Sequence, residues 1–274
     1  MTNLEFNRSA IRAGNCVSGA WKVVTGNLAT YLAVILFIVA IYIVIAVINA
    51  FIPVLSIFLT IANVLFMAVL AGGIYYIAIQ DVDREPSDFG MIFTGFAKAG
   101  PLLLAGFIEA IPSVAFAVLQ FTGYFANLFG LGSLGPPRAA LYQSQSGVGA
   151  LNALPAIIFI IAVGYLLFLI LWGLVFFFTT PLIMDKNLGA VEAIVLSARS
   201  AFSSAGGAIL LMILSFFIAV LGALAFCVGL FVAIPVIWVA KVIAYRAVFP
   251  SLDQQRWDTP PPPSEYGSVF GQGV

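Results

Sequence analysis

The stretch that decides the fold is residues 179–206, TTPLIMDKNLGAVEAIVLSARSAFSSAG, which joins two long apolar segments. Its first residues complete an apolar segment, and a short polar turn follows at 185–187. Apolar residues then recur at helical spacing, at Leu188, Val191, Val195, Ala198 and Phe202. Polar residues fall on the other side of that helix. The pattern predicts the end of one membrane span, a turn, an amphipathic helix in the membrane surface, and the start of the next span.

The composition places the whole chain in a membrane. Hydrophobic residues make up 63% of the sequence and charged residues 8%, whereas a soluble domain carries about 25% charged residues. A span needs about 20 apolar residues. Six segments qualify, at roughly 29–48, 57–79, 100–127, 155–182, 208–227 and 230–248. The predicted fold class is an all-α polytopic membrane bundle with six transmembrane helices.

Two further stretches resemble the first, so the chain reads as three similar units. In-plane helices are expected near 9–27, 87–98 and 188–204, each followed by a hairpin of two spans. The helix at 9–27 reads equally well as an extension of the first span. The helix at 87–98 is expected to have Ser87 as its N-cap. Its Phe89, Phe93 and Phe96 should lie against the spans or in the headgroup layer, with Asp88 and Lys98 pointing to water.

The basic residues predict the orientation. Of the 11 lysines and arginines, Arg138 alone falls on one side of the expected membrane topology. Cytoplasmic loops carry the excess of basic residues, so both termini and the three in-plane helices should be cytoplasmic. Residues 1–249 form the six-span membrane domain in this interpretation. Residues 250–274 form a Pro-rich cytoplasmic tail, either disordered or a docking site for a partner.

Candidate chemistry is concentrated at two places. The segment after the second span carries Asp81, Asp83, Glu85 and Asp88, which fit either a metal or catalytic cluster or a solvated loop. The chain contains no histidine and its formal net charge is zero. We therefore expect no metal site, no cofactor, no catalytic residue and no nucleic-acid partner.

Glu109 is the ionisable residue deepest within an apolar segment. A charge at the bilayer centre costs about 2.5–3.5 kcal/mol on insertion scales, so Glu109 is expected to face the bundle interior with a polar partner. Pro112 follows within one turn and would free the carbonyl near residue 108, to which a protonated Glu109 could donate. Glu109 is either a neutral structural anchor or a functional protonation or substrate site.

Three stretches carry a resemblance to a known family. REPSDFGMIFTGF (84–96), TTPLIMDKNLGAVEAIVLSARSAF (179–202) and GLFVAIPVIWVAKVIAYR (229–246) resemble a group of bacterial membrane proteins. That group is related to the membrane domain of glycerophosphodiester phosphodiesterases. The resemblance covers roughly residues 15–250 and implies a six-helix protein of the bacterial cytoplasmic (inner) membrane. The phosphodiesterase domain itself is lacking, so no catalytic residue is carried over.

These observations favour a non-enzymatic integral membrane protein that organises, assembles or binds partners. The lipid bilayer is its expected surroundings, with a protein partner or a second copy of the chain as further candidates. The alternative is a transporter or channel for a small solute or lipid, with Glu109 as its intramembrane site. A lipid-modifying enzyme ranks last, because the sequence contains no known catalytic motif.

Overall fold

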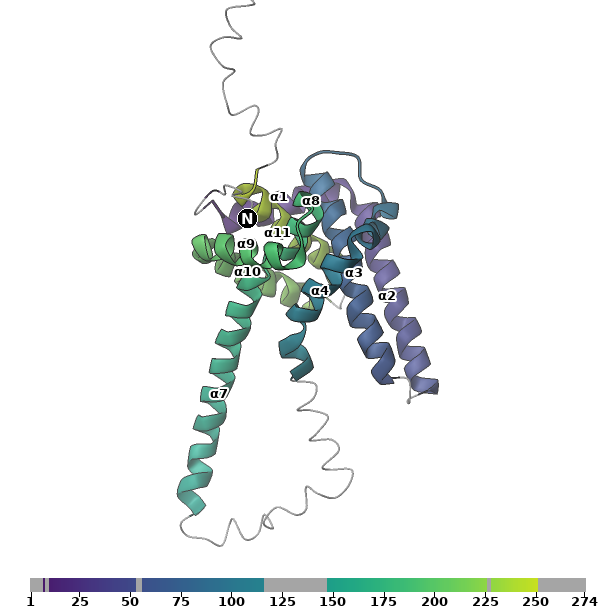
Figure 1. Cartoon of the computed structure of the whole chain (residues 1–274). Coiled ribbons are helices and arrows are strands. Elements are labelled where there is room, and N and C mark those ends of the chain that lie inside the picture. Colours follow the sequence, from purple (N-terminus) through teal and green to yellow (C-terminus); the bar gives the residue numbers. More distant parts are fainter. Residues whose placement is uncertain (1–6, 8–9, 53–55, 116–146, 226–227, 251–274) are drawn as a thin grey trace, which may run out of the picture. The chain divides into compact units, whose positions relative to one another are not determined.

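The computed structural model describes residues 7, 10–52, 56–115, 147–225 and 228–250, and every regular element in them is a helix (Figure 1). The elements are α1 (Ala13–Gly26), α2 (Leu28–Phe51), α3 (Ser56–Val82), the 3-10 helix η2 (Phe89–Lys98), α4 (Ala99–Glu109), α7 (Gly147–Val175), α8 (Thr179–Lys186), α9 (Ala190–Ser203), α10 (Ala205–Leu224) and α11 (Leu230–Val248). Six helical stretches within the described residues are long and apolar enough to cross a membrane. The predicted all-α membrane bundle is therefore confirmed.

The observed bounds differ from the predicted ones mainly in the second hairpin. The third spanning stretch, expected at 100–127, is Phe89–Glu109, which includes η2 at the place of the expected in-plane helix 87–98. The expected part beyond residue 115 lies outside the described residues. The fourth spanning stretch, Phe159–Lys186, is broken between α7 and α8. The polar loop predicted at 129–154 is wrong in its last part, because α7 begins at Gly147. Alanines and leucines in that segment favour helix over loop. The rest of the loop with Arg138, the tail from 251 and Cys227 lie outside the described residues.

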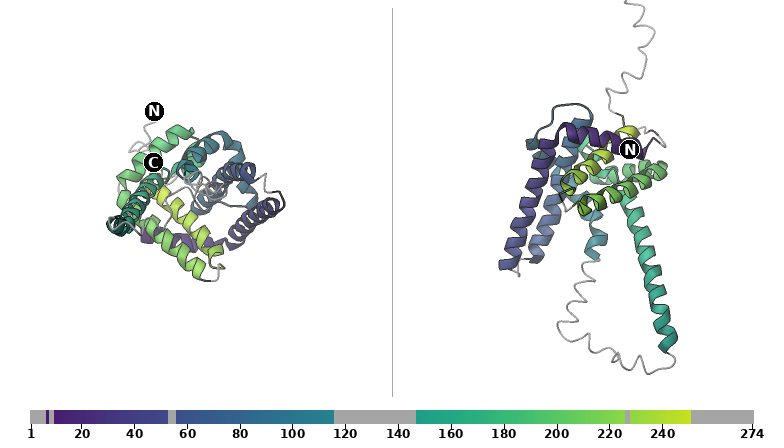
Figure 2. Two further views of the ribbon diagram at one scale, coloured as in Figure 1. Left: turned by 90° about the horizontal axis from the view of Figure 1, so that it is seen from below. Right: turned by 180° about the vertical axis from the view of Figure 1, so that it is seen from behind.

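The chain divides into two compact units, which are described separately. The first unit comprises Met1–Ala40, Ile74–Ile92 and Phe202–Val274, and the second comprises Ile41–Gly73 and Phe93–Ala201. In the first unit α1 lies beside α11 and α10 (Figure 2). This packing is close because α1 buries mainly small side chains on that side. The main-chain N–H of Asn7 donates to the carbonyl of Val248 and fastens the N-terminal segment to the end of α11.

The second unit packs its helices through glycines. A Cβ on Gly95 of η2 would overlap the main-chain carbonyl of Val69 in α3, and a Cβ on Gly72 would overlap the side chain of Leu102 in α4. Small residues at such positions allow helices to approach closely. Aromatic rings complete the contact, since Phe66 and Phe96 lie with their centroids 5.9 Å apart.

The predicted threefold repeat of a short helix followed by two spans gains support from the backbone at the helix junctions. One residue outside α-helical geometry lies directly before the helix that follows each short helix: Asn27 after α1, Lys98 at the end of η2, and Ser204 after α9. Its dihedral angles are φ −130° and ψ 43° at Asn27, and φ −120° and ψ 29° at both Lys98 and Ser204. The same three positions around each junction residue are buried. The residues three positions before it are Val24, Gly95 and Ala201, and those four positions after it are Tyr31, Leu102 and Ala208. The residues seven positions after it are Val34, Ala105 and Leu211. One turn-and-burial pattern therefore recurs three times.

Helices α1 and α9 share even more of this pattern. Both have 14 residues, and four buried residues in each have the same spacing: Ala13, Cys16, Ala20 and Val24 in α1; Ala190, Ala193, Ser197 and Ala201 in α9, which also buries Ser200. The large side chains at Val191, Val195 and Phe202 are exposed instead. Helices α1 and α9 thus bury mainly small residues and leave large residues exposed, as expected for a face that meets lipid.

Candidate functional site

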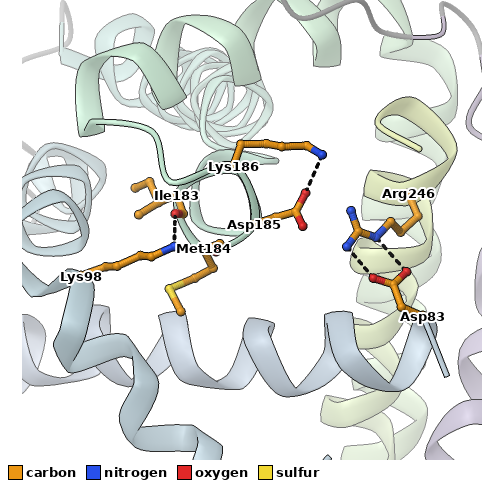
Figure 3. A network of polar contacts seen from close by, with 7 residues as sticks. All are labelled: Asp83, Lys98, Ile183, Met184, Asp185, Lys186 and Arg246. Atoms are coloured by element: carbon orange, nitrogen blue, oxygen red, sulfur yellow. Dashed lines mark hydrogen bonds and ion pairs between the residues drawn. The ribbon is translucent and has the colours of Figure 1, made fainter. Parts of the chain in front are cut away.

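Charged and polar side chains at the helix ends form the first candidate site. In the first unit, Arg246 near the end of α11 makes a two-point ion pair with Asp83, which follows α3 (Figure 3). The Nη2–Oδ2 distance is 2.5 Å and the Nε–Oδ1 distance is 3.0 Å. The two side chains are only 7% and 16% exposed. Such fork-like pairing fixes orientation as well as charge, so it holds the two helix ends together.

Asp81 lies at the centre of a second cluster in the same unit. Its carboxylate accepts hydrogen bonds from the Ser87 hydroxyl at 2.5 Å and from the Asn27 side-chain amide at 3.2 Å. Asn27 is the junction residue before α2, so this cluster ties the start of α2 to the end of α3. The cluster stabilises the fold through hydrogen bonds to a carboxylate, which are stronger than neutral ones.

These contacts revise the expectation for the acidic segment. Glu85 and Asp88 are exposed, as a solvated loop requires, but Asp81 and Asp83 are anchored structural residues. The prediction of Ser87 as the N-cap of the next helix is wrong. Its hydroxyl is turned to Asp81, and the Asp88 carboxylate accepts the N–H of Gly90 at 3.1 Å instead. Aspartate suits this position because its charge also interacts favourably with the helix dipole.

In the second unit, the junction residue Lys98 binds the end of α8 (Figure 3). Its ammonium Nζ donates to the carbonyls of Ile183 at 3.2 Å and Met184 at 2.7 Å. The last carbonyls of a helix have no partner within it, and a lysine can satisfy them. The prediction that Lys98 points to water is therefore wrong. Asn187 ends α8 in the left-handed conformation, with φ 54°, and so closes that helix instead of starting the next.

The break between α7 and α8 has a cause that the sequence contains. Pro181 has no N–H to donate to the carbonyl of Phe177, and its ring disfavours a continuous helix there. The chain consequently loosens at Phe176–Phe178, and the freed N–H of Phe178 donates to the Ser197 hydroxyl of α9 at 2.9 Å. Ser197 is fully buried. A buried N–H without a partner costs about 1–3 kcal/mol, so this serine stabilises the interruption.

Glu109 occupies the other interruption of the second unit. Helix α4 ends at Glu109 and the chain turns at Ala110, close to Pro112. The main-chain carbonyl of Glu109 accepts the indole N–H of Trp172 in α7 at 3.1 Å. The structure thus brings a polar partner from another span to this residue, although to its main chain. The side chain itself is exposed, which differs from the expected interior position.

Among the described residues, no group of three or more histidine, cysteine, aspartate or glutamate side chains is arranged to hold a metal ion. Cys16 is one of the buried residues of α1, and burial raises the pKa of its thiol. Sequence reasoning missed Arg246, Trp172 and Ser197 as structural residues. The prolines that create the helix breaks were a usable signal for the last two.

The fold and these contacts define an all-α integral membrane protein whose polar side chains fasten helix ends and helix interruptions. Comparison with known protein families, with curated proteins and with solved structures finds no match to this chain.

Proposed function

We propose that this chain is a non-enzymatic protein of the bacterial cytoplasmic membrane that organises or assembles partners, with both termini in the cytoplasm. The observation that supports the proposal best is that α9 has a face of small buried residues and an opposite face of exposed apolar residues. Its inward face is small and is bonded to the break between α7 and α8 through Ser197. Its outward face presents Val191 and Val195, which are 62% and 45% exposed.

An outward apolar face is suited to binding a neighbouring molecule in the membrane. Glu192 and Arg199 are exposed on the same helix and add charges of both signs near that face, which favours a chosen partner over general association. The charged pairs of the polar sites are engaged within their own units, which leaves the face of α9 as the better candidate for recognition. The sequence resemblance to membrane domains related to those of glycerophosphodiester phosphodiesterases, and the clustering of basic residues on one side, support the cellular location.

The test is site-specific cross-linking in native membranes. A photoreactive amino acid at Val195 should form a discrete adduct with one or a few proteins, identified by mass spectrometry. Adding Val191→Ser should weaken the adduct, because it places a hydroxyl in the apolar face. The matched change Leu210→Ser, at a similarly exposed site on α10, should leave the adduct intact. Cross-linking to lipid alone, or equal loss in both variants, would count against a protein-organising role.

A transporter or channel is the second candidate, and Glu109 favours it. An ionisable residue within a spanning segment commonly marks a pathway for an ion or substrate. The variant Glu109→Gln separates the candidates, because an amide can accept a hydrogen bond but cannot exchange a proton. Solute or proton flux into proteoliposomes that disappears in this variant, with an unchanged Val195 adduct, would establish transport.

A further inference from the structure

The exposed face of α9 carries one acidic and one basic side chain, Glu192 and Arg199, beside the apolar Val191 and Val195. Seven residues make almost two full helical turns, so the two charges lie on the same side of the helix, about 10 Å apart along it. Neither side chain forms an ion pair within the described part of the chain. The face therefore presents a negative and a positive charge that its own chain does not compensate.

This combination of charges sets α9 apart from the other two short helices. Helix α1 contains a single charged residue, Lys22, and η2 contains a single charged residue, Lys98. A single cation suits an anionic lipid surface. A helix with both signs of charge at a fixed spacing instead complements a helix that carries the same two charges in the reverse order.

A second copy of α9 provides that reverse order. Copies of a membrane protein share one orientation across the bilayer, so a two-fold axis that relates two of them runs along the membrane normal. Such an axis reverses the direction of any helix that lies in the membrane plane, as α9 is predicted to lie. With the axis between Val195 and Leu196, Glu192 of each copy falls opposite Arg199 of the other, since both residues are equally far from the axis in the sequence.

We propose that α9 pairs antiparallel with α9 of a second copy of this chain. The pairing rests on the proposed function, because it uses the same exposed face of α9 and names its partner. Two ion pairs between Glu192 and Arg199 set the direction and register of the pairing, as charged side chains do beside the apolar contact of paired helices. Val195, at the centre, meets its counterpart in the other copy. Since both copies use the same face, the assembly closes as a dimer.

Disulfide trapping in native membranes tests the register. In a background lacking Cys16 and Cys227, Val195→Cys should give a covalent dimer on mild oxidation, because the two copies of residue 195 are offset by about 1.5 Å along the helices. Val191→Cys is the matched control, and this position is the more exposed of the two, at 62% against 45%. Its two copies are offset by about 13 Å, beyond the Cα separation of about 7 Å that a disulfide tolerates, so this variant should remain monomeric.

Charge reversal tests the ion pairs. Glu192→Lys or Arg199→Glu alone would place like charges opposite each other at two points, and each should lower the yield of the Val195→Cys dimer at least about fivefold. The double reversal restores opposite charges and should return the yield to within about twofold of the parent. Recovery in the double variant also shows that the single variants lost the contact and not the fold.

Three results would overturn the pairing: no covalent dimer from Val195→Cys, equal dimer from Val191→Cys, or a double reversal that remains monomeric. The photoreactive residue at Val195 separates this failure from failure of the proposed function. An adduct with a second copy of the chain supports both. An adduct with a different protein alone overturns the pairing and leaves the assembly role, whereas an adduct with lipid alone overturns both.

Discussion

The ion pair between Asp83 and Arg246 offers the sharpest test of the polar contacts at the helix ends. Removing one partner of a buried pair leaves an uncompensated charge and typically costs about 3–5 kcal/mol. Since the two side chains keep 16% and 7% exposure, the low end of that range applies. We expect Asp83→Ala and Arg246→Met each to lower the free energy of unfolding by about 3 kcal/mol.

The double variant should be less destabilised than either single one, because no unpaired charge remains in it. Reversible unfolding in mixed micelles with rising SDS, followed by circular dichroism, gives the three free energies of the double-mutant cycle. Arg199→Met, at an exposed arginine on α9, is the control and should stay within about 0.5 kcal/mol of the parent protein. Additive losses, or single variants as stable as the control, would refute the structural role of the pair.

Three further predictions test individual contacts. Gly95→Ala should destabilise the protein by at least about 2 kcal/mol, because the added Cβ would overlap the Val69 carbonyl. A Cβ added at Gly100 would meet no atom within 4 Å. Gly100→Ala should therefore be neutral or slightly stabilising in the same unfolding assay. Ser197→Ala should cost about 1–3 kcal/mol by leaving a buried N–H without its acceptor, and a loss below 0.5 kcal/mol, roughly the size of a surface effect, would contradict the bond. Burial raises the pKa of the Cys16 thiol above its ordinary 9.0, so its stabilising contribution should be present below about pH 9 and be lost as pH rises through the folded-state pKa. Alkylation of the folded protein, without its other cysteine, should accordingly require higher pH than alkylation of the denatured protein, and equal rates would contradict the burial.

The sequence predicted the spanning helices well because their signal is local. A run such as Leu28–Phe51 is apolar throughout, and no distant residue is needed to recognise it. The short helices were also predictable from spacing and from the polar turns before them. The sixth span was placed at the observed bounds, since Gly229 precedes it and Pro250 follows it.

The polar contacts were harder to predict because they join residues far apart in the chain. Nothing near Asp83 indicates that Arg246 lies beside it, and both residues also fit a hydrated membrane edge. Lys98 illustrates the same difficulty, since a lysine at a helix junction suits water as well as it suits the carbonyls at the end of α8. Local sequence patterns predict where a helix lies, whereas the residues that its polar side chains contact depend on tertiary packing.

Glu109 combines a successful and an unsuccessful expectation. Pro112 correctly indicated an interruption in which a carbonyl would need a partner from elsewhere, and Trp172 provides it. The predicted interior position of the side chain was wrong, since Glu109 is exposed although Leu102, Ala105 and Pro112 on the same side are buried.

We propose that the three short helices α1, η2 and α9 lie on the cytoplasmic side of the membrane, as the basic residues predict. Single cysteines at Glu85, Arg199 and Arg138, in a background lacking Cys16 and Cys227, test it directly with a membrane-impermeant maleimide. We expect labelling at 138 in intact cells, and labelling at 85 and 199 only after the membrane is opened. Labelling of 85 and 199 from opposite sides, or the reverse of the expected pattern, would contradict it.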